Sequence, residues 1–366
     1  MRSGIAAVLL LAAVPAFAAE IVIGQSAPLT GANAELGNDI RNGALAYFKK
    51  VNDAGGLPQG KIKLVTLDDK NQTALSAENT KKLVEEENVV ALFGYASSTL
   101  SIPAMPEVKE NRVPFFAPFT GADTIRKQNE FVYTIRSTYV DEIGKIVNFW
   151  GSLGNTRVTV LHYDDTVGKE NFATVAEALK KFGGAPASVA IKRNADVPAS
   201  AVKQVVDSKP NVLLITTLYA PAAQLIKQLK ASGNQYMVSS LSFAGASQLA
   251  HALGPDASGV SVAIDVPAPR TVSIPVVKEC NDAWTASAQK GLMSVTALES
   301  CIAAKVLVEG MKHAGKEVTR ASLHKSLDAL GRYDAGGYIV NFKPNFRHGG
   351  SYVGIALLYP SGEVRE

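Results

Sequence analysis

The chain has little of what metal binding and covalent catalysis require. Its 366 residues include only two cysteines and five histidines, and none of them has the spacing of a metal-ligand set. The sequences Gly-x-Ser-x-Gly, Gly-x-x-x-x-Gly-Lys-Ser/Thr and His-Glu-x-x-His are absent, and no Gly-x-Gly-x-x-Gly follows the first expected strand. We therefore expect no metal, no cofactor and no enzymatic activity.

A strong excess of one charge is also missing. Lysine and arginine number 37 against 33 aspartate and glutamate residues, and the formal net charge of +4 forms no basic block. Proteins that bind nucleic acid usually concentrate positive charge on one face. Nucleic acid is therefore not an expected partner.

Long hydrophobic runs are confined to the start of the chain. Arg2 precedes the apolar run 5–14, and the small-residue triplet 16–18 follows it, which is the pattern of a secretory signal cleaved near Ala18. The run is shorter than the roughly 20 residues that a membrane-spanning helix needs, and no later stretch reaches that length without a charge or a turn residue. We therefore expect a soluble, exported protein.

The two cysteines, Cys280 and Cys301, do not follow the expected cleavage site, where a lipoprotein anchor requires a cysteine. We therefore expect no lipid anchor. In an oxidising compartment the two side chains pair if the helices that carry them lie side by side, and otherwise they remain separate buried thiols. The sequence leaves both outcomes open.

The rest of the chain, roughly 350 residues, exceeds what one hydrophobic core usually organises, so two domains are expected. Apolar runs typical of strands alternate with helical stretches, and such alternation builds parallel sheets flanked by helices. The fold class is therefore α/β. Expected strands are 21–24, 61–67, 89–94 and 113–117 in the first unit, then 156–163, 187–191, 212–216 and 235–239 in the second, followed by 338–342 and 352–359; the main helices are expected near 37–51, 74–87, 100–111, 171–182, 276–289 and 295–313.

Hydroxyl and glycine residues gather in loops that follow strands of the first unit. In open parallel sheets, ligands bind outside the carboxyl ends of the strands. Hydroxyls and free N–H groups at a helix start suit a carboxylate or another small oxyanion, although a serine there can simply cap the helix and the second loop can be an ordinary turn. The candidates are Tyr95, Ser97 and Ser98 in one loop, and Phe119, Thr120 and Gly121 in the next.

Aromatic and hydroxyl residues follow the strands of the second unit in the same way. If the two units face each other, all these loops line one cleft. The aspartates at 164–165 also follow a strand there, but caps and Asx turns are their commoner role. The candidates from this unit are Tyr163, Tyr219, Ser242 and Phe243.

Several segments together resemble the type I periplasmic binding proteins of branched-chain amino acid transporters. The similarity runs in order over nearly the whole chain after the signal. The segments are Ile-Val-Ile-Gly-Gln-Ser-Ala-Pro-Leu-Thr-Gly at 21–31, Val-Asn-Asp-Ala-Gly-Gly at 51–56, Leu-Asp-Asp at 67–69, the Ser-Ser pair at 97–98 and the loop 118–121.

The resemblance implies two Rossmann-like lobes joined by three crossovers, near 136–139, 263–269 and 338–342. Lobe 1 would comprise 19–137 and 267–340, and lobe 2 would comprise 138–266 and 341–366. It further implies a periplasmic protein that closes on a small molecule by hinge motion and delivers it to an ABC permease with its ATPase subunits. A ligand sensor for a membrane receptor and an exported enzyme on the same architecture are the alternatives.

Carried over residue by residue, the resemblance implies a ligand site with an intact carboxylate half. Ser98 falls on the serine that holds the ligand carboxylate, and Phe119 and Gly121 fall on two contacts of the next loop. Tyr219 falls on or beside a ligand-facing tyrosine. An apolar wall would come from Tyr95, Phe119, Tyr163, Tyr219 or Phe243.

The other half departs from the family pattern. Ser242 stands where amino acid binders carry an acidic residue, and Val167 stands where they carry a tyrosine before a glycine. Burying an ammonium group without a charged partner is unfavourable. The expected ligand is therefore an aromatic or short aliphatic acid without an amine, unless Asp164, Asp165 or Asp265 supplies the missing charge from elsewhere.

Overall fold

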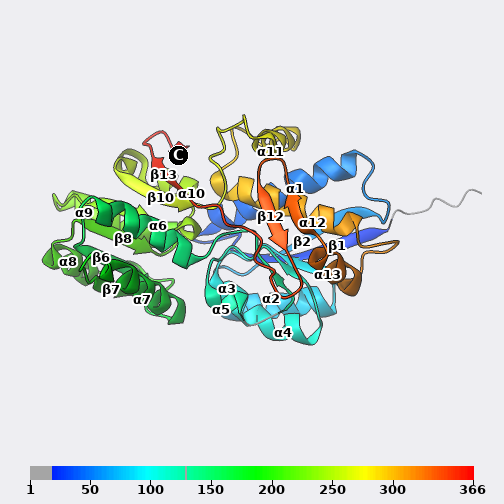
Figure 1. Cartoon of the computed structure of the whole chain (residues 1–366), viewed down its shortest axis with the longest axis horizontal. Helices are drawn as coiled ribbons and strands as arrows, with labels where there is room; N and C mark the ends of the chain where they lie inside the picture. The colour runs from blue at the N-terminus through cyan, green and yellow to red at the C-terminus, as the bar shows by residue number, and fades with distance from the viewer. Residues whose placement is uncertain (1–18, 128–129) are drawn as a thin grey trace, which may run out of the picture.

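The chain folds into two lobes that lie side by side along its longest axis (Figure 1). The computed structural model describes residues 19–127 and 130–366, so the expected secretory signal at 1–18 lies outside the described residues. Each lobe is built on its own sheet with helices packed against it, which confirms the expected two-lobed α/β fold. Within the described ranges, no helix combines the length and the apolar character needed to cross a membrane.

The first lobe contains a five-stranded parallel sheet in the order β2-β1-β3-β4-β5. Its central strands are completely buried, since both faces of a parallel sheet are covered. Phe93 and Phe116 stack between neighbouring strands, with their ring centroids 6.4 Å apart. The strands are β1 (Glu20–Ala27), β2 (Lys61–Asp68), β3 (Ala91–Phe93), β4 (Phe115–Phe116) and β5 (Val132–Tyr133).

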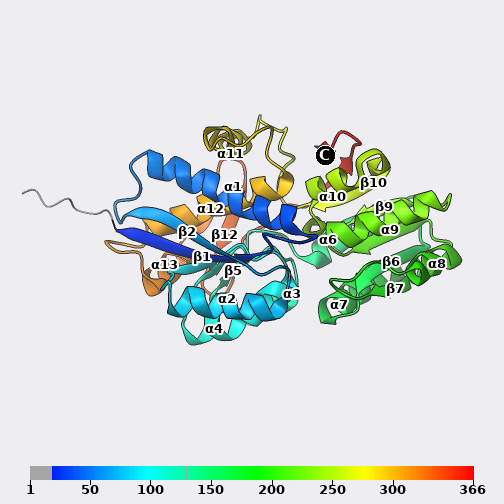
Figure 2. The ribbon, with the colours of Figure 1, turned by 180° about the vertical axis from the view of Figure 1, so that it is seen from behind.

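Two long helices, α1 and α12, run side by side over this sheet in both views of the ribbon (Figures 1 and 2). Gly43 permits the close approach, because a Cβ there would lie 2.1 Å from the carbonyl oxygen of Ala297. Cys280 and Cys301 form a disulfide that joins α11 to α12. The elements of this lobe are α1 (Ala34–Asp53), α2 (Thr73–Glu85), α3 (Ser98–Ser101), α4 (Met105–Glu110), α5 (Asp123–Arg126), α11 (Pro275–Ala286), α12 (Val295–Lys312), α13 (Arg320–Asp328) and the hairpin β11 (Gly331–Asp334) to β12 (Ile339–Phe342).

The second lobe contains a seven-stranded sheet in the order β14-β13-β10-β9-β8-β6-β7. Strands β6 to β9 are parallel as expected, and β10, which was not expected, extends the parallel part, whereas β13 and β14 add an antiparallel edge. Its elements are α6 (Tyr139–Ser152), β6 (Val158–Tyr163), α7 (Thr166–Lys180), β7 (Ala187–Ile191), α8 (Ala199–Ser208), β8 (Val212–Thr216), α9 (Tyr219–Ala231), β9 (Met237–Ser240), α10 (Ala246–Leu253), β10 (Val260–Ile264), β13 (Gly354–Leu358) and β14 (Val364–Arg365).

The chain passes between the two sheets three times: from β5 to α6, from β10 to α11 and from β12 to β13. Most of the segment 338–342, where the third crossover was expected, forms β12 instead, and Phe342 packs against Phe116 of the first lobe. Gly349 also stays with that lobe, because its N–H donates to the carbonyl oxygen of Thr134. We therefore propose a third lobe boundary near Gly350 rather than at 340–341.

Candidate functional site

Hydroxyl groups from two loops of the first lobe meet at one point. Ser98 begins α3 and Thr120 follows β4, and their side-chain oxygens are 2.5 Å apart. Ser97 caps α3, because its side-chain oxygen accepts a hydrogen bond from the backbone N–H of Leu100. One serine of this loop therefore caps the helix, as considered from the sequence, while its neighbour turns to Thr120.

Tyr139 connects these hydroxyls to the second lobe. It is the first residue of α6, its hydroxyl interacts with Thr120, and its ring centroid lies 5.1 Å from that of Phe243. Gly121 is needed beside it, because a Cβ there would fall 2.7 Å from the Tyr139 ring and 2.8 Å from its backbone nitrogen. Thr120, Gly121 and Phe243 are thus brought together between the lobes.

A buried carboxylate lies beside Ser242, the serine that stands where amino acid binders carry an acidic residue. The backbone N–H and the hydroxyl of Ser242 both donate to the carboxylate of Glu142, each at 2.8 Å. Glu142 lies on α6 and is completely buried. Burial, reinforced by the nearby Asp265, raises the pKa of Glu142 well above its usual range. A cation close to Glu142 would lower this pKa again, because it stabilises the ionised form.

Further charged groups surround Glu142 near the passages between the lobes. Arg136 donates two hydrogen bonds of 2.6 Å to Glu299 and lies 3.1 Å from Asp265. Its guanidinium carbon also lies 5.0 Å from the ring centroid of Phe119. Arg126, which is partly buried and interacts with Asp265, adds a second positive charge to this network. Since Arg136 pairs with Glu299 and Asp265, Glu142 is the carboxylate of this group that has no ion pair among the described residues.

Tyr163 and Tyr219 approach the first lobe from the second. The Tyr163 hydroxyl accepts a hydrogen bond from the backbone N–H of Leu218, and the guanidinium of Arg193 lies 3.7 Å from its ring centroid. Burial, together with the charge of Glu35 in the other lobe, raises the pKa of Tyr219 to about 12. The backbone of Glu35 also hydrogen-bonds to the Tyr219 hydroxyl, so this tyrosine bridges the lobes.

Tyr95 lies apart from the other candidates. Its ring is completely buried in the first lobe, 4.8 Å from that of Phe115, and its hydroxyl lies 3.0 Å from that of Thr80. These residues belong to a core cluster of that lobe. The structure therefore places the Tyr95 side chain in the core and not in the cleft.

The two aspartates at 164–165 are occupied elsewhere. Asp164 forms an exposed ion pair with Lys169, whereas Asp165 caps α7 and pairs with Arg193. Of the three aspartates named as replacements for the missing acidic residue, only Asp265 lies in the network around Glu142.

A cavity of about 530 Å³ lies between the lobes next to Tyr163. Asn71 and Asn194 join its two sides, since Nδ2 of Asn71 donates to Oδ1 of Asn194 at 2.6 Å and Nδ2 of Asn194 donates to the Asn71 carbonyl oxygen at 2.8 Å. The lobes are therefore in direct contact across the cleft, as in a closed form. The cavity is lined by residues 32–33 and 70–72 of the first lobe and by 163, 194–196, 220–221 and 224 of the second.

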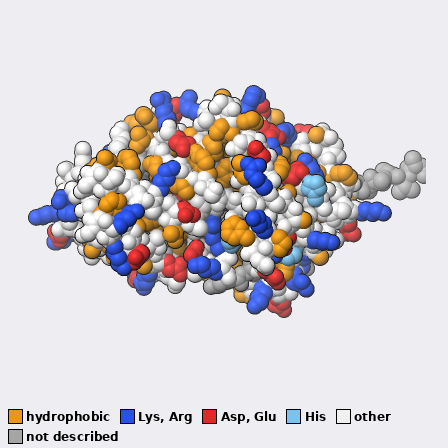
Figure 3. All heavy atoms as spheres, viewed as in Figure 1, with side chains coloured by type: hydrophobic (Ala, Val, Ile, Leu, Met, Phe, Trp, Pro, Cys, Tyr) orange, Lys and Arg blue, Asp and Glu red, His pale blue; other side chains and the backbone are white. Residues whose placement is uncertain are grey.

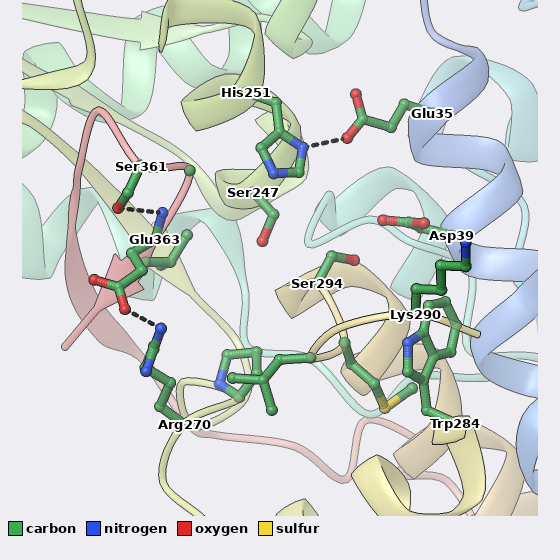
Figure 4. Close-up of a pocket in the computed structure, with 15 residues that line it drawn as sticks. Glu35, Asp39, Ser247, His251, Arg270, Trp284, Lys290, Ser294, Ser361 and Glu363 are labelled. Atoms are coloured by element: carbon green, nitrogen blue, oxygen red, sulfur yellow. Dashed lines mark hydrogen bonds and ion pairs between the residues drawn. The ribbon is translucent and has the colours of Figure 1, made fainter. Parts of the chain in front are cut away.

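A second cavity, of about 300 Å³, lies near the passage from β10 to α11, and no candidate from the sequence lines it (Figure 4). The close-up shows His251 of α10 reaching Glu35 at the start of α1, with Nδ1 and Oε1 2.7 Å apart. Gln248 donates to Asp39 at the same distance. These contacts add polar bridges between the lobes, and the hydrogen bond to Glu35 raises the pKa of His251.

Sequence reasoning missed Glu142, which lies 100 residues before its partner Ser242. No local pattern joins two such residues. A signal was nevertheless present, because Glu142 shares one face of α6 with the buried residues Tyr139, Ile143 and Ile146. A lone carboxylate on the apolar face of a helix indicates a group that needs a specific partner.

Comparison with known proteins agrees with this architecture. The family model described as periplasmic binding protein matches residues 20–356. An amino acid binding protein from Pseudomonas aeruginosa is 28% identical over 167 residues, which are 45% of this chain and 45% of that relative. The aligned part thus spans less than half the length of this curated relative.

Two solved structures are similar over nearly the whole chain. A possible leucine/isoleucine/valine-binding protein from Rhodopirellula baltica has a TM-score of 0.91 at 27% identity, with 97% of this chain and 98% of that chain covered. A substrate-binding periplasmic protein from Ralstonia solanacearum has a TM-score of 0.88 at 30% identity, with 94% and 99% covered. The matched family consists of binding proteins rather than enzymes. The chain therefore belongs to the periplasmic binding protein family, as its resemblance to the type I members that serve branched-chain amino acid transporters predicted.

Proposed function

We propose that the chain is the solute-binding component of an ABC importer and binds a small carboxylate-bearing solute between its lobes. The relative from Pseudomonas aeruginosa is named an amino acid binding protein, and the structure from Rhodopirellula baltica is described as a possible leucine/isoleucine/valine-binding protein. These names support a small carboxylate as ligand. In the import cycle, a permease and its ATPase subunits would receive the solute from the closed protein.

One observation carries the proposal: opposite chemical groups lie on the two sides of the lobe interface. The hydroxyls of Ser98 and Thr120 come from the first lobe, and the carboxylate of Glu142, held by Ser242, comes from the second. Tyr139 touches both sides. Hydroxyl donors suit a carboxylate, whereas a buried carboxylate suits a cation.

The position of Glu142 changes the ligand that we propose. The sequence favoured an amine-free acid because Ser242 replaced the acidic residue of amino acid binders. Ser242 instead holds a carboxylate that comes from α6. We therefore propose a solute with both a carboxylate and an ammonium group, as in an α-amino acid, because Arg136 pairs with Glu299 and Asp265, whereas Glu142 has no ion pair of its own among the described residues.

Binding would favour closure because the two ends of the solute contact different lobes. A ligand shifts a conformational equilibrium by its difference in affinity for the two states. The open form offers only one half of this site at a time, whereas the closed form offers both. Hinge closure around the solute follows from that difference.

Thermal unfolding of the mature protein with alanine, propionate or ethylamine tests the proposal. A ligand that binds only the folded state stabilises it by roughly 2.7 kcal/mol at 100 times its Kd. Alanine, which carries both charged groups, should raise the unfolding midpoint more than propionate or ethylamine. Ser98→Ala should reduce the effect of alanine, whereas Ser152→Ala at the exposed end of α6 should not. Equal stabilisation by propionate would refute the ammonium subsite, and no stabilisation by alanine or propionate would refute the carboxylate site.

A further inference from the structure

The two lobes touch through two sets of polar contacts that lie at different distances from the crossovers. One set is on α10, where Gln248 donates to Asp39 and His251 meets Glu35 (Figure 4). The cavity beside these residues is also lined by residues 269–270, which belong to the second crossover. This set of contacts therefore lies close to the hinge.

The other set is the pair formed by Asn71 and Asn194, and the order of the strands places it far from the hinge. Asn71 follows β2, the edge strand opposite β5, where the first crossover begins. Asn194 follows β7, at the end of the second sheet opposite β10 and β13, which carry the other two crossovers. The third crossover itself runs across the face of the molecule seen in Figures 1 and 3, where side chains of the two lobes meet.

This difference in position decides which contacts survive when the lobes open. In a hinge motion the lobes move as rigid bodies, and a few residues in the crossovers absorb the change in backbone angles. Rotation about the hinge displaces a contact in proportion to its distance from the axis. Opening therefore separates Asn71 from Asn194 more than it disturbs the contacts of α10.

Each asparagine is held in place on its own lobe. The backbone N–H of Asn71 donates to Oδ1 of Asp69 at 2.8 Å, and beside Asn194 the guanidinium of Arg193 pairs with Asp165 at 2.7 Å. The φ values of Asn71 and Asn194 are 58° and 57°, in the left-handed region that asparagine adopts more readily than most residues other than glycine. The two loops thus present their amides in position to meet when the lobes close, which lowers the entropic cost of forming the contact.

The two hydrogen bonds of this pair differ in the side chains they need. Nδ2 of Asn71 donates to Oδ1 of Asn194 at 2.6 Å, so this bond needs both side chains. Nδ2 of Asn194 donates to the backbone carbonyl oxygen of Asn71 at 2.8 Å, so this bond needs only the Asn194 side chain. Both bonds join the lobes, and they therefore stabilise the closed form relative to the open one.

We propose that Asn71 and Asn194 form a latch that holds the closed form and thereby sets how long the solute stays bound. Both are positioning residues, because they act on the solute through the position of the lobes. The inference rests on the proposed function, since a bound solute is what the closed form retains. When the binding-competent state becomes less populated, the apparent affinity falls with it.

Glycine variants remove the latch and keep the backbone, because glycine adopts the left-handed conformation without strain. Asn71→Gly removes one of the two hydrogen bonds, whereas Asn194→Gly removes both. We expect isothermal titration with alanine to give a Kd about threefold higher for the first variant and about tenfold higher for the second. The double variant should equal Asn194→Gly, because no bond remains for the second substitution to remove.

Asn88→Gly is the matched control. Asn88 is exposed and also has a left-handed backbone, with a φ of 48°, but it precedes β3 and so lies away from the carboxyl ends of the strands. This variant should bind alanine like the wild type. Unfolding curves without ligand check that all the variants fold, and each single variant tests the latch without the others.

Stopped-flow kinetics separates a latch from a direct contact with the solute. The rate constant for alanine dissociation should rise by the same factor as the Kd, while the association rate constant stays unchanged, because the open form that captures the solute lacks the pair. A Kd of Asn194→Gly within about twofold of the wild type would overturn the latch. So would a slower association at unchanged dissociation, or a further loss in the double variant. In each of these cases the proposed function stands, because the wild type still binds alanine; failure of the wild type to bind alanine would overturn the proposed function and this inference with it.

Discussion

Replacing Glu142 by glutamine tests the ammonium subsite with little change in shape. The amide of E142Q still offers one oxygen to Ser242, but it places an NH2 donor where the carboxylate has its second acceptor oxygen. It also no longer attracts a cation. The variant should therefore bind alanine more weakly, while propionate, which lacks the ammonium group, should be affected little.

The structure allows a rough magnitude for this loss. Removing one partner of a buried, hydrogen-bonded charge pair costs about 2–5 kcal/mol. Because E142Q keeps an acceptor and Arg136 remains nearby, we expect the lower part of this range, about 2–3.5 kcal/mol, or about 30- to 400-fold in Kd. Isothermal titration of wild type and variant with alanine and with propionate measures both effects.

Glu177→Gln is the matched control, because Glu177 forms an exposed ion pair on α7 and its loss changes the net charge by the same amount. This control should bind alanine like the wild type. Thermal unfolding of E142Q checks that the variant folds. Equal weakening of alanine and propionate, or an alanine affinity that changes by less than about threefold, would refute the role assigned to Glu142.

Three further predictions concern the contacts that hold the structure. Gly121→Ala should destabilise the protein by about 1–3 kcal/mol, because the added methyl group overpacks against Tyr139. Gly144→Ala has open space around its Cβ and should be neutral or slightly stabilising. Chemical denaturation of the two variants measures the difference. Because the pKa of His251 is raised, its bridge to Glu35 stabilises the folded state fully below about pH 6.5, and this stabilisation is lost as the pH rises through the pKa of the folded state. His251→Gln should therefore reduce the fall of the unfolding midpoint with pH above about 6.5. An unchanged pH profile of the unfolding midpoint would contradict this. Replacing Cys280 and Cys301 by alanine should cost about 3 kcal/mol, since the disulfide closes a loop of 21 residues, and an unchanged denaturation midpoint would contradict it.

The alternation of apolar runs and helical stretches was enough to predict the fold class, because that alternation is local. The ends of the helices and strands were harder to predict. The helix expected to end near 111 is divided into short segments, since Pro103 and Pro106 lack the N–H that a continuous helix needs. Helix α7 begins earlier than expected because Asp165 caps it. Strand β10 was not among the expected strands, although all five of its residues are buried.

The candidate site was predictable where it depends on topology alone. Loops at the carboxyl ends of parallel strands converge, and Ser98 and Thr120 do meet. The direction of a single side chain was not predictable in this way, and Tyr95 turns into the core. Contacts between elements that are far apart in the sequence could not be predicted either, which is why Glu142 of α6, the partner of Ser242, was missed.

A crystal structure of the mature protein grown with alanine tests the central claim most directly. We predict that the ligand lies between the lobes, with its carboxylate within hydrogen-bond distance of Ser98 or Thr120 and its ammonium group beside the carboxylate of Glu142. Alanine bound with its ammonium group away from Glu142, or bound only in the cavity near His251, would contradict the account.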